Sequence, residues 1–433
     1  CPVKMEYSRL LDEKVIVTLC KELKLNKDQI YYSEAPLSMS FISQIRDKLH
    51  GKKDLFYVRR VPQNSRYVRS SLSMMEQIEA EDILLSYPFE SMQPFIRLLN
   101  EAGENEKVVS IKMTLYRVAK NSQIVEALIN AAENGKEVVV LVELRARFDE
   151  ENNIEWSRRL EDAGCRIIYG IDHIKVHSKL CLITYCDGTE VKHITQIGTG
   201  NYNEQTAKLY TDLSLMTANQ DIAEEAAQVF NRLCMAQVME ETHHLLVAPK
   251  CLQNKVLDFI EEEICHADNN EPAYIGVKMN SLTDKTIIDK MVEASQHGVK
   301  IDLVVRGICC LIPGIEGYTE NIRVISIVGR YLEHSRIYIF GTPERDKMFI
   351  SSADFMTRNM VKRVEVATPI YDTAIKDRVR TMFGIMLHDT VKGRELCRDG
   401  NYYRREKPQE ESEVISSQAY FSNEAYLAAS KNV

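Results

Sequence analysis

The chain has 433 residues and a formal net charge of −8, with 45% hydrophobic and 27% charged residues, which is typical of a folded globular protein with roughly two to three domains. The acidic balance argues against a general nucleic-acid-binding surface, so we expect no nucleic acid partner. No apolar run approaches the ~20 residues that cross a bilayer, and no signal peptide is recognisable, so we expect a cytoplasmic protein. The sequence opens on Cys1 in mid-flow, and we expect an upstream part of the protein to precede it.

The first 75 residues mix helical stretches with the polar, irregular segment VPQNSRYVRSS. We interpret residues 1–75 as the remnant of a separate module followed by a linker. Beyond them the pattern becomes regular: residues 108–116 predict a strand, 121–136 an amphipathic helix and 137–144 a buried strand. This order is a βαβ unit, which predicts a parallel strand pair with a right-handed crossover.

The second half of the chain repeats this unit. Residues 274–280 predict a strand, 283–298 a helix and 299–307 a strand, and we match Lys112 in IKM with Lys278 in VKM. A repeat at about one domain length indicates an internal duplication. We therefore expect two domains of one fold, at residues 76–245 and 246–433.

A histidine and a cation recur after each unit. KVHSKLCLITY carries His177 and Lys179, and YLEHSRIYIF carries His334 and Arg336. Side chains two apart on a strand share a face, so each histidine is predicted to lie beside its cation. A lone H-x-K is more often a core histidine with a snorkelling lysine, but its recurrence after both units favours a functional pair.

A polar, turn-rich stretch follows each histidine, at residues 198–215 and 351–370. Asn201 in the first aligns with Asp354 in the second, and Asp212 and Glu365 follow these at the same interval. A carboxylate that accepts one ring N–H of a histidine fixes its tautomer and leaves the other nitrogen free to attack. Ordinary surface salt bridges are the alternative for these two acids.

Two histidines that face each other across one cleft suit phosphoryl transfer, because an imidazole nitrogen can attack phosphorus while cations neutralise the phosphate oxygens. We expect His177 to be the nucleophile and His334 to stabilise the transferring phosphate. Lys179 and Arg336 are assigned to the catalytic group with them. The chain has no P-loop motif. Arg117, Arg147 and Arg306 fall at or just beyond the C-terminal ends of predicted strands, where ligands bind in open α/β sheets, so we expect them to contact phosphate, with a solvated surface as the alternative. Further cations lie around these elements: Arg145, Lys208, Arg330, Arg358, Lys362 and Arg363.

Residues 80 to 400 closely resemble polyphosphate kinase, a relative of the phospholipase D superfamily. The resemblance rests on DILLSYPF, IKVHSKL, IGTGNYNEQTAKLYTDLSL, VRGICCLIPG and SSADFMTRNMVKRVEVATPI, among other stretches. It implies an α/β fold with two tandem phospholipase D-like domains, each a mixed β-sheet flanked by helices, preceded by the remnant of a head domain. Residues 1–75 would then be the end of that head domain and a linker.

The resemblance also implies residue roles. His177 matches the histidine that becomes phosphorylated, and Tyr210, Arg306 and His334 match nucleotide-binding positions. Phosphate contacts are expected from Arg117, Arg147, Asn201 and Lys208. Arg117 and Arg147 match positions that the family associates with magnesium. A charged guanidinium has no free lone pair, so we infer that these arginines hold phosphate oxygens that share the metal.

The expected function is reversible transfer of the terminal phosphate of ATP to inorganic polyphosphate through a phosphohistidine, with Mg²⁺ as cofactor and ATP, ADP and polyphosphate as partners. The family tends to form homo-oligomers and can associate peripherally with membrane. The alternative is a phospholipase D-type phosphodiesterase. In that family an aspartate follows the histidine by seven residues, where this chain has Thr184 and Gly341. A non-catalytic polyphosphate-binding protein is a third hypothesis.

Overall fold

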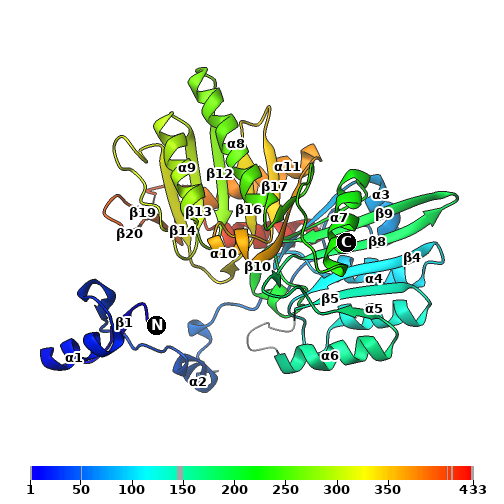
Figure 1. Ribbon diagram of the computed structural model, residues 1–433, viewed down its shortest axis with the longest axis horizontal. Helices are drawn as coiled ribbons and strands as arrows, with labels where there is room; N and C mark the ends of the chain where they lie inside the picture. The colour runs from blue at the N-terminus through cyan, green and yellow to red at the C-terminus, as the bar shows by residue number, and fades with distance from the viewer. Residues whose placement is uncertain (1, 50, 144–149, 407, 411–412, 431–433) are drawn as a thin grey trace. The chain divides into compact units, whose positions relative to one another are not determined.

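The computed structural model describes residues 2–49, 51–143, 150–406, 408–410 and 413–430 (Figure 1). It separates into two compact units, Cys1–Arg59 and Arg60–Val433. In the first unit, β1 (Met5–Tyr7) pairs in parallel with β2 (Ile30–Tyr32). The unit also contains helices α1 (Glu13–Leu23) and α2 (Phe41–Lys48) and the short helices η1 (Lys27–Gln29) and η2 (Lys53–Leu55). Among the described residues of this unit, Leu25 alone is a buried hydrophobic side chain, so the unit has little core of its own.

The second unit contains two large mixed sheets, of which the first runs in the order β15-β10-β9-β8-β4-β5-β6, with β3 also paired to β10. Its strands from the first half of the unit are β3 (Ile83–Tyr87), β4 (Val108–Leu115), β5 (Glu137–Val142), β6 (Arg166–Ile168), β8 (Leu180–Asp187), β9 (Glu190–Gly198) and β10 (Tyr210–Thr217). Its helices are α3 (Met74–Ala80), α4 (Gln93–Glu104), α5 (Gln123–Glu133), α6 (Glu150–Asp162), the short η3 (Thr206–Lys208) and α7 (Gln220–Cys234).

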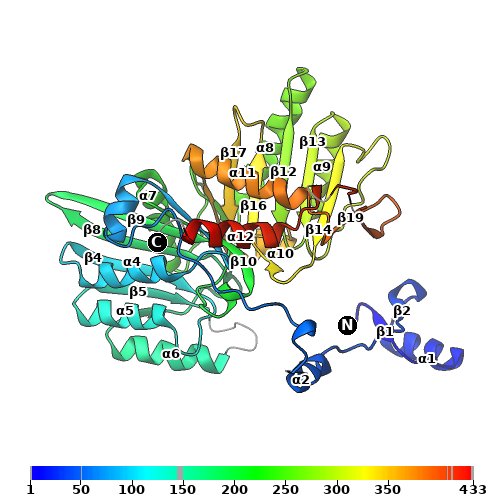
Figure 2. The ribbon, with the colours of Figure 1, turned by 180° about the vertical axis from the view of Figure 1, so that it is seen from behind.

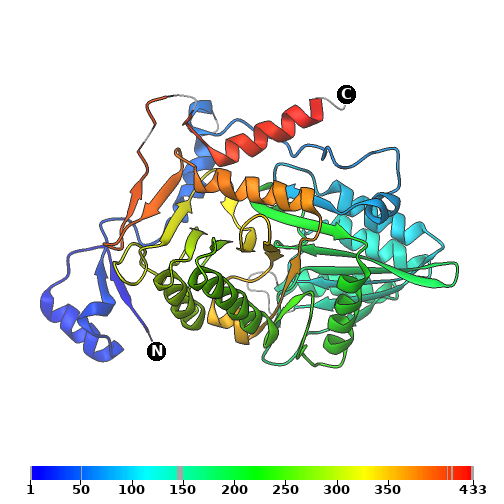
Figure 3. The same cartoon turned by 90° about the horizontal axis from the view of Figure 1, so that it is seen from above.

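The second sheet runs in the order β11-β18-β17-β16-β12-β13-β14-β19-β20. Its strands are β11 (Leu246–Ala248), β12 (Tyr274–Met279), β13 (Lys300–Val305), β14 (Ile322–Ile327), β16 (Arg336–Phe340), β17 (Lys347–Ser351), β18 (Arg363–Pro369), β19 (Gly393–Leu396) and β20 (Tyr402–Arg404). Helices α8 (Cys251–Asp268) and α9 (Lys285–Gln296) cover one face, and α11 (Thr373–Leu387) and α12 (Ser417–Ser430) cover the other, while α10 (Thr357–Val361) precedes β18 (Figures 2 and 3).

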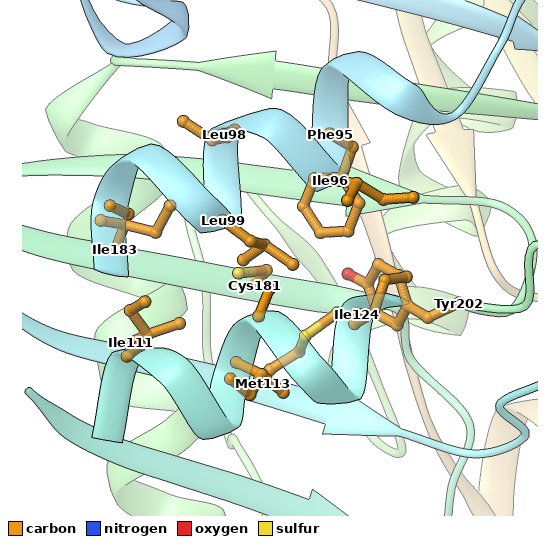
Figure 4. Close-up of a cluster of buried hydrophobic side chains, with 14 of the residues drawn as sticks. Phe95, Ile96, Leu98, Leu99, Ile111, Met113, Ile124, Cys181, Ile183 and Tyr202 are labelled. Atoms are coloured by element: carbon orange, nitrogen blue, oxygen red, sulfur yellow. The ribbon is translucent and has the colours of Figure 1, made fainter. Parts of the chain in front are cut away.

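The predicted βαβ units are β4-α5-β5 and β12-α9-β13, and the strands of each unit pair in parallel. Each helix begins at a side chain that caps its free N–H groups, Ser122 for α5 and Asp284 for α9. Each ends before a glycine with positive φ, Gly135 and Gly298, a conformation that glycine adopts without strain. The apolar faces of α4 and α5 pack on the first sheet around side chains such as Phe95 (Figure 4). The predicted α/β fold class with two helix-flanked mixed sheets is confirmed.

The strand register corrects the match between Lys112 and Lys278. Lys112 pairs with Leu182, five residues beyond the first histidine, whereas Lys278 pairs with Ile337, three residues beyond the second. The two lysines are therefore two positions apart in the duplicated strand, because the similar words IKM and VKM do not mark equivalent sites. Lys278 is the one that lies against a histidine segment.

The sequence predicts that each H-x-[KR] segment lies inside one continuous strand. The structure shows that it does not. The short strand β7 (Lys175–Val176) precedes His177 and pairs with β18 of the second sheet, while β8 begins only at Leu180 in the first sheet. Likewise β15 (Leu332–Glu333) precedes His334 and pairs with β10 of the first sheet. Each histidine therefore sits where the chain crosses from one sheet to the other.

Candidate active site

His177 is oriented by a carboxylate from the other half of the chain. Its Nδ1 lies 2.9 Å from Glu365 on β18, and the Glu365 side chain is fully buried. Ser352 Oγ and Asn359 Nδ2 donate to the same carboxylate at 2.5 and 2.6 Å. With Nδ1–H donated to Glu365, the lone pair on Nε2 of His177 is free for attack.

His334 has the same arrangement with the halves exchanged. Its Nδ1 lies 2.8 Å from Oδ1 of Asp212 on β10, and Thr199 Oγ1 donates to that oxygen at 2.6 Å. A Cβ on Gly200 would lie 2.0 Å from Asp212 Oδ2, so only glycine fits beside this carboxylate. The close approach to the acid explains why the chain has a glycine at position 200.

The crossed pairing follows from the exchanged strands. Because Val364 lies opposite Val176, the next residue on β18 reaches His177, and because Thr211 lies opposite Glu333, the next residue on β10 reaches His334. The sequence indicated an orienting role for both acids, but it could not show that each acid serves the histidine of the other half.

Burial sets the protonation of the first half-site. It lowers the pKa of His177 to about 3, so the imidazole is neutral at neutral pH, and it lowers the pKa of Lys179 to about 7. Burial also disfavours ionised Glu365, but His177 and Lys179 beside it more than offset this and hold its pKa below the usual value. A neutral imidazole hydrogen-bonded to an ionised carboxylate is the state that a nucleophile needs.

The two cations of the H-x-[KR] pairs are buried beside their histidines. Lys179 Nζ donates to the backbone O of His177 and lies 5.4 Å from the ring centroid of Tyr116. Arg336 Nη1 lies 3.2 Å from His334 Nε2, and its Nε contacts Asp354 Oδ1 at 3.2 Å. The histidine side chains keep 13% and 15% of their surface, so a substrate can reach them.

The predicted nucleotide-binding residues also lie near His334. The Tyr210 ring centroid is 5.2 Å from that of His334. Arg306 Nε donates to Glu333 O at 2.8 Å, and its Nη2 donates to Asn280 Oδ1 at 2.9 Å. Tyr210 and Arg306 thus both lie close to His334, the second histidine.

Some of the residues predicted to contact phosphate lie near a histidine, and others do not. Arg117 lies 5.6 Å from the Tyr116 ring, which itself packs edge-on against His177 with centroids 5.0 Å apart. Asn201 follows the glycine beside Asp212, and its buried side-chain oxygen has no hydrogen-bond partner among the described residues. Lys208 is exposed at the end of η3, and no contact within the described part of the chain brings it to either histidine. Arg145 and Arg147 lie outside the described residues.

The other cations that the sequence analysis named differ in whether they reach the site. Arg363 lies 3.8 Å from Glu365, and Arg330 lies over the Tyr331 ring at 5.2 Å. Lys362 and Arg358 lie near the β7 pairing, where the backbone O of Lys362 accepts from Lys175 N at 3.1 Å. Of this set, Arg363 reaches the carboxylate that orients His177.

Sequence reasoning missed a buried ion pair beneath His334. Lys278 Nζ lies 3.0 Å from Glu333 and donates to Ser335 Oγ at 2.8 Å, and all of these groups are buried. Gln418 Nε2 on α12 donates to the other oxygen of Glu333 at 2.7 Å. A lysine within the otherwise apolar strand YIGVKM was the available signal, but its partner comes from a segment with no visible relation to it.

No group of three or more His, Cys, Asp or Glu side chains suited to a metal ion occurs among the described residues. Three carboxylates beside the histidines, Asp212, Asp354 and Glu365, are each engaged by a histidine or an arginine, and Glu333 is paired with Lys278. In the same ranges, no helix combines the length and apolarity that crossing a membrane requires.

The two sheets and their paired H-x-[KR] segments define a duplicated α/β protein of the phospholipase D-like class. A solved phosphatidylserine synthase from Haemophilus influenzae shares this fold, with a TM-score of 0.51 and 11% identity over 81% of this chain and 94% of that one. Family models for polyphosphate kinase C-terminal domain 1 and C-terminal domain 2 match residues 73–239 and 245–418. The chain belongs to the polyphosphate kinase family.

Individual relatives agree with this assignment. The polyphosphate kinases of Bacillus anthracis and Staphylococcus epidermidis are each 45% identical, over 91% and 98% of this chain. The solved polyphosphate kinase of Porphyromonas gingivalis superposes with a TM-score of 0.84 and 33% identity, over 98% of this chain and 65% of that one. The chain spans 56% and 57% of the lengths of the first two relatives.

Proposed function

We propose that the protein is a polyphosphate kinase that transfers the terminal phosphate of ATP reversibly to inorganic polyphosphate through a phosphohistidine on His177. The observation that carries the proposal is the neutral, carboxylate-oriented imidazole of His177 beside the buried Lys179, with the buried Arg336 beside His334. Family membership supports the same reaction.

In the first step, Nε2 of His177 attacks the terminal phosphorus of ATP, the bond from phosphorus to the bridging oxygen breaks, and ADP leaves with that electron pair. In the second step, a terminal oxygen of polyphosphate attacks the same phosphorus, and the P–N bond breaks to restore the imidazole. Lys179 and Arg336 neutralise the phosphate oxygens in both steps, and His334 stabilises the transferring group.

Magnesium enters this proposal with the substrate. Mg²⁺ favours phosphate oxygens and water with one or two carboxylates, and the carboxylates beside the histidines are engaged by protein groups. The ion therefore fits as part of the ATP complex, where it would neutralise phosphate charge, and Arg117 and Arg147 would hold oxygens that share it. A cytoplasmic location, homo-oligomerisation and peripheral association with membrane remain predictions.

Incubation with ATP labelled at the terminal phosphate tests the proposal. The wild-type protein should acquire acid-labile label and pass it to polyphosphate, and His177→Ala should acquire none. His193→Ala is the matched control, because His193 contacts Thr184 in the first sheet and lies outside the site. Label that persists on His177→Ala contradicts the assignment. Hydrolysis of a phosphodiester without labelling from ATP would favour the phosphodiesterase.

A further inference from the structure

A basic cavity lies beside the second histidine. It has a volume of about 460 Å³ and opens where β13 and β14 end. The described residues that line it include no aspartate or glutamate and four cations: Arg306, Lys392, Arg394 and Arg404. In an acidic protein, a cavity with this one-sided charge favours an anionic ligand.

Three of the four cations, Lys392, Arg394 and Arg404, come from an addition to the duplicated fold. The first sheet ends at β6, whereas the second continues past β14 with the hairpin β19–β20. In that hairpin Arg394 pairs directly with Arg404, and on its other side Arg394 faces Ser326 of β14. Like charges directly opposite each other destabilise a sheet, and among the described residues neither guanidinium has a hydrogen bond or an ion pair. Such a pair is stabilised when a shared anion binds.

The cavity adjoins the candidate active site at Arg306. That side chain lines the cavity and donates from Nε to the backbone O of Glu333, the residue before His334. A ligand with phosphate at the histidines can therefore extend past Arg306 to the hairpin.

We propose that this cavity is a subsite for the distal phosphates of a polyphosphate chain whose end lies at the histidines. The inference rests on the proposed function and adds a location for the part of the substrate that does not react. Guanidinium groups bind phosphate oxygens through paired hydrogen bonds, so a row of cations fits a run of phosphates. ATP carries three phosphates followed by a nucleoside, and for its base this lining offers little aromatic surface beyond the half-buried Tyr402.

The test compares Arg394→Gln/Arg404→Gln with the wild-type protein in calorimetric titrations with long-chain polyphosphate, tripolyphosphate and ATP. The matched control is Lys285→Gln/Lys300→Gln, which removes the same charge at exposed positions, with Lys300 at the opposite end of β13. Loss of hydrogen bonds to charged groups should weaken long-chain binding at least about tenfold in the arginine variant. Binding of ATP and tripolyphosphate, and all binding by the control, should be unchanged.

Thermal unfolding of the arginine variant shows whether it is folded, so that weaker binding can be distinguished from misfolding. Removing two like charges from opposite positions should leave the arginine variant at least as stable as wild type. Long-chain binding equal to wild type overturns the subsite, as does an equal loss of ATP binding or an equal loss in the control. A wild-type protein that binds no polyphosphate of any length overturns the proposed function itself.

Discussion

Glu365 is the carboxylate that contacts Nδ1 of His177, at 2.9 Å. Glu365→Gln keeps the shape but removes the anion that accepts Nδ1–H, and the amide can present N–H instead of oxygen to the ring. We expect phosphorylation from ATP to slow at least about tenfold, since a hydrogen bond to a charged group typically contributes about 1.5–3 kcal/mol. Single-turnover labelling measures the rate.

Ser352→Ala provides a graded comparison, because it removes one donor to Glu365 and leaves the carboxylate in place. Its rate should lie between those of wild type and Glu365→Gln. A Glu365→Gln protein that is labelled as fast as wild type would show that the carboxylate does not orient the nucleophile.

Lys179 gives the site a pH dependence whose sign can be worked out. Burial lowers its pKa to about 7, so the ammonium is charged below that pH and neutral above it. Because the charge is needed against phosphate oxygens, kcat/KM for ATP should fall as the pH rises through about 7. His177, with a pKa of about 3, stays neutral and should cause no loss between neutral pH and mildly acidic pH.

Lys179→Arg tests this directly, because the second half of the chain has Arg336 at the corresponding position. A guanidinium stays protonated throughout this pH range, so the fall above neutral pH should disappear. If the variant keeps the same fall, another group titrates.

The histidine and cation pairs could be predicted from the sequence because the two residues of each pair are close neighbours in the chain. His177 and Lys179 are two apart, and their recurrence as His334 and Arg336 marked both pairs. The partners of the histidines could be recognised as acids, but their crossed assignment depends on strands that pair only after the two sheets meet. The contact of Gln418 with Glu333 had no signal at all, since it joins the last described helix to the middle of the second half.

At the scale of elements, helix α12 is connected to the second histidine. Gln418 donates from Nε2 to Glu333 and to Tyr331 O, and its side-chain oxygen accepts from Tyr331 N at 2.9 Å. Glu333 and its partner Lys278 in turn hold the segment that carries His334. The helix therefore positions a residue that it does not touch.

Gln418→Ala should leave Glu333 with an unsatisfied oxygen and loosen the segment that carries His334. We expect a lower kcat with little change in KM for ATP, and a loss of about 1–3 kcal/mol in the free energy of unfolding. Kinetics and denaturant unfolding measure the two effects. Leu427→Ala, an exposed change on the same helix, is the control. A change in stability with an unaltered kcat would limit Gln418 to a structural role.

The helices and strands were easier to predict than the breaks between them. Hydrophobic periodicity and capping residues such as Ser122 and Asp284 located both βαβ units. The hydrophobic alternation continued without a break through His177 and His334. It therefore did not indicate the points where the chain leaves one sheet for the other. Those breaks arise because β7 and β15 find their partners in the opposite sheet, a tertiary choice that local pattern does not encode.

At the scale of the whole molecule, duplication has produced two half-sites that depend on each other. Each sheet supplies a strand that pairs with the neighbouring segment of the other half, and each supplies the acid for the other histidine. The two halves also differ: among the described residues, only the second extends its sheet with two further strands, β19 and β20. The repeated arrangement therefore explains why both histidines have the same geometry.

The crossed pairing predicts which substitutions are coupled. If Asp212 acts through His334, then Asp212→Asn should slow phosphorylation in the wild-type background and add nothing to His334→Gln. Contacting residues typically show coupling energies of about 0.5–3 kcal/mol in such cycles. Asp212→Asn and Ser352→Ala act on different histidines, so their effects on the rate should multiply. Single-turnover labelling of His177 measures all five variants, and effects of Asp212→Asn and His334→Gln that multiply would contradict the pairing across the two halves.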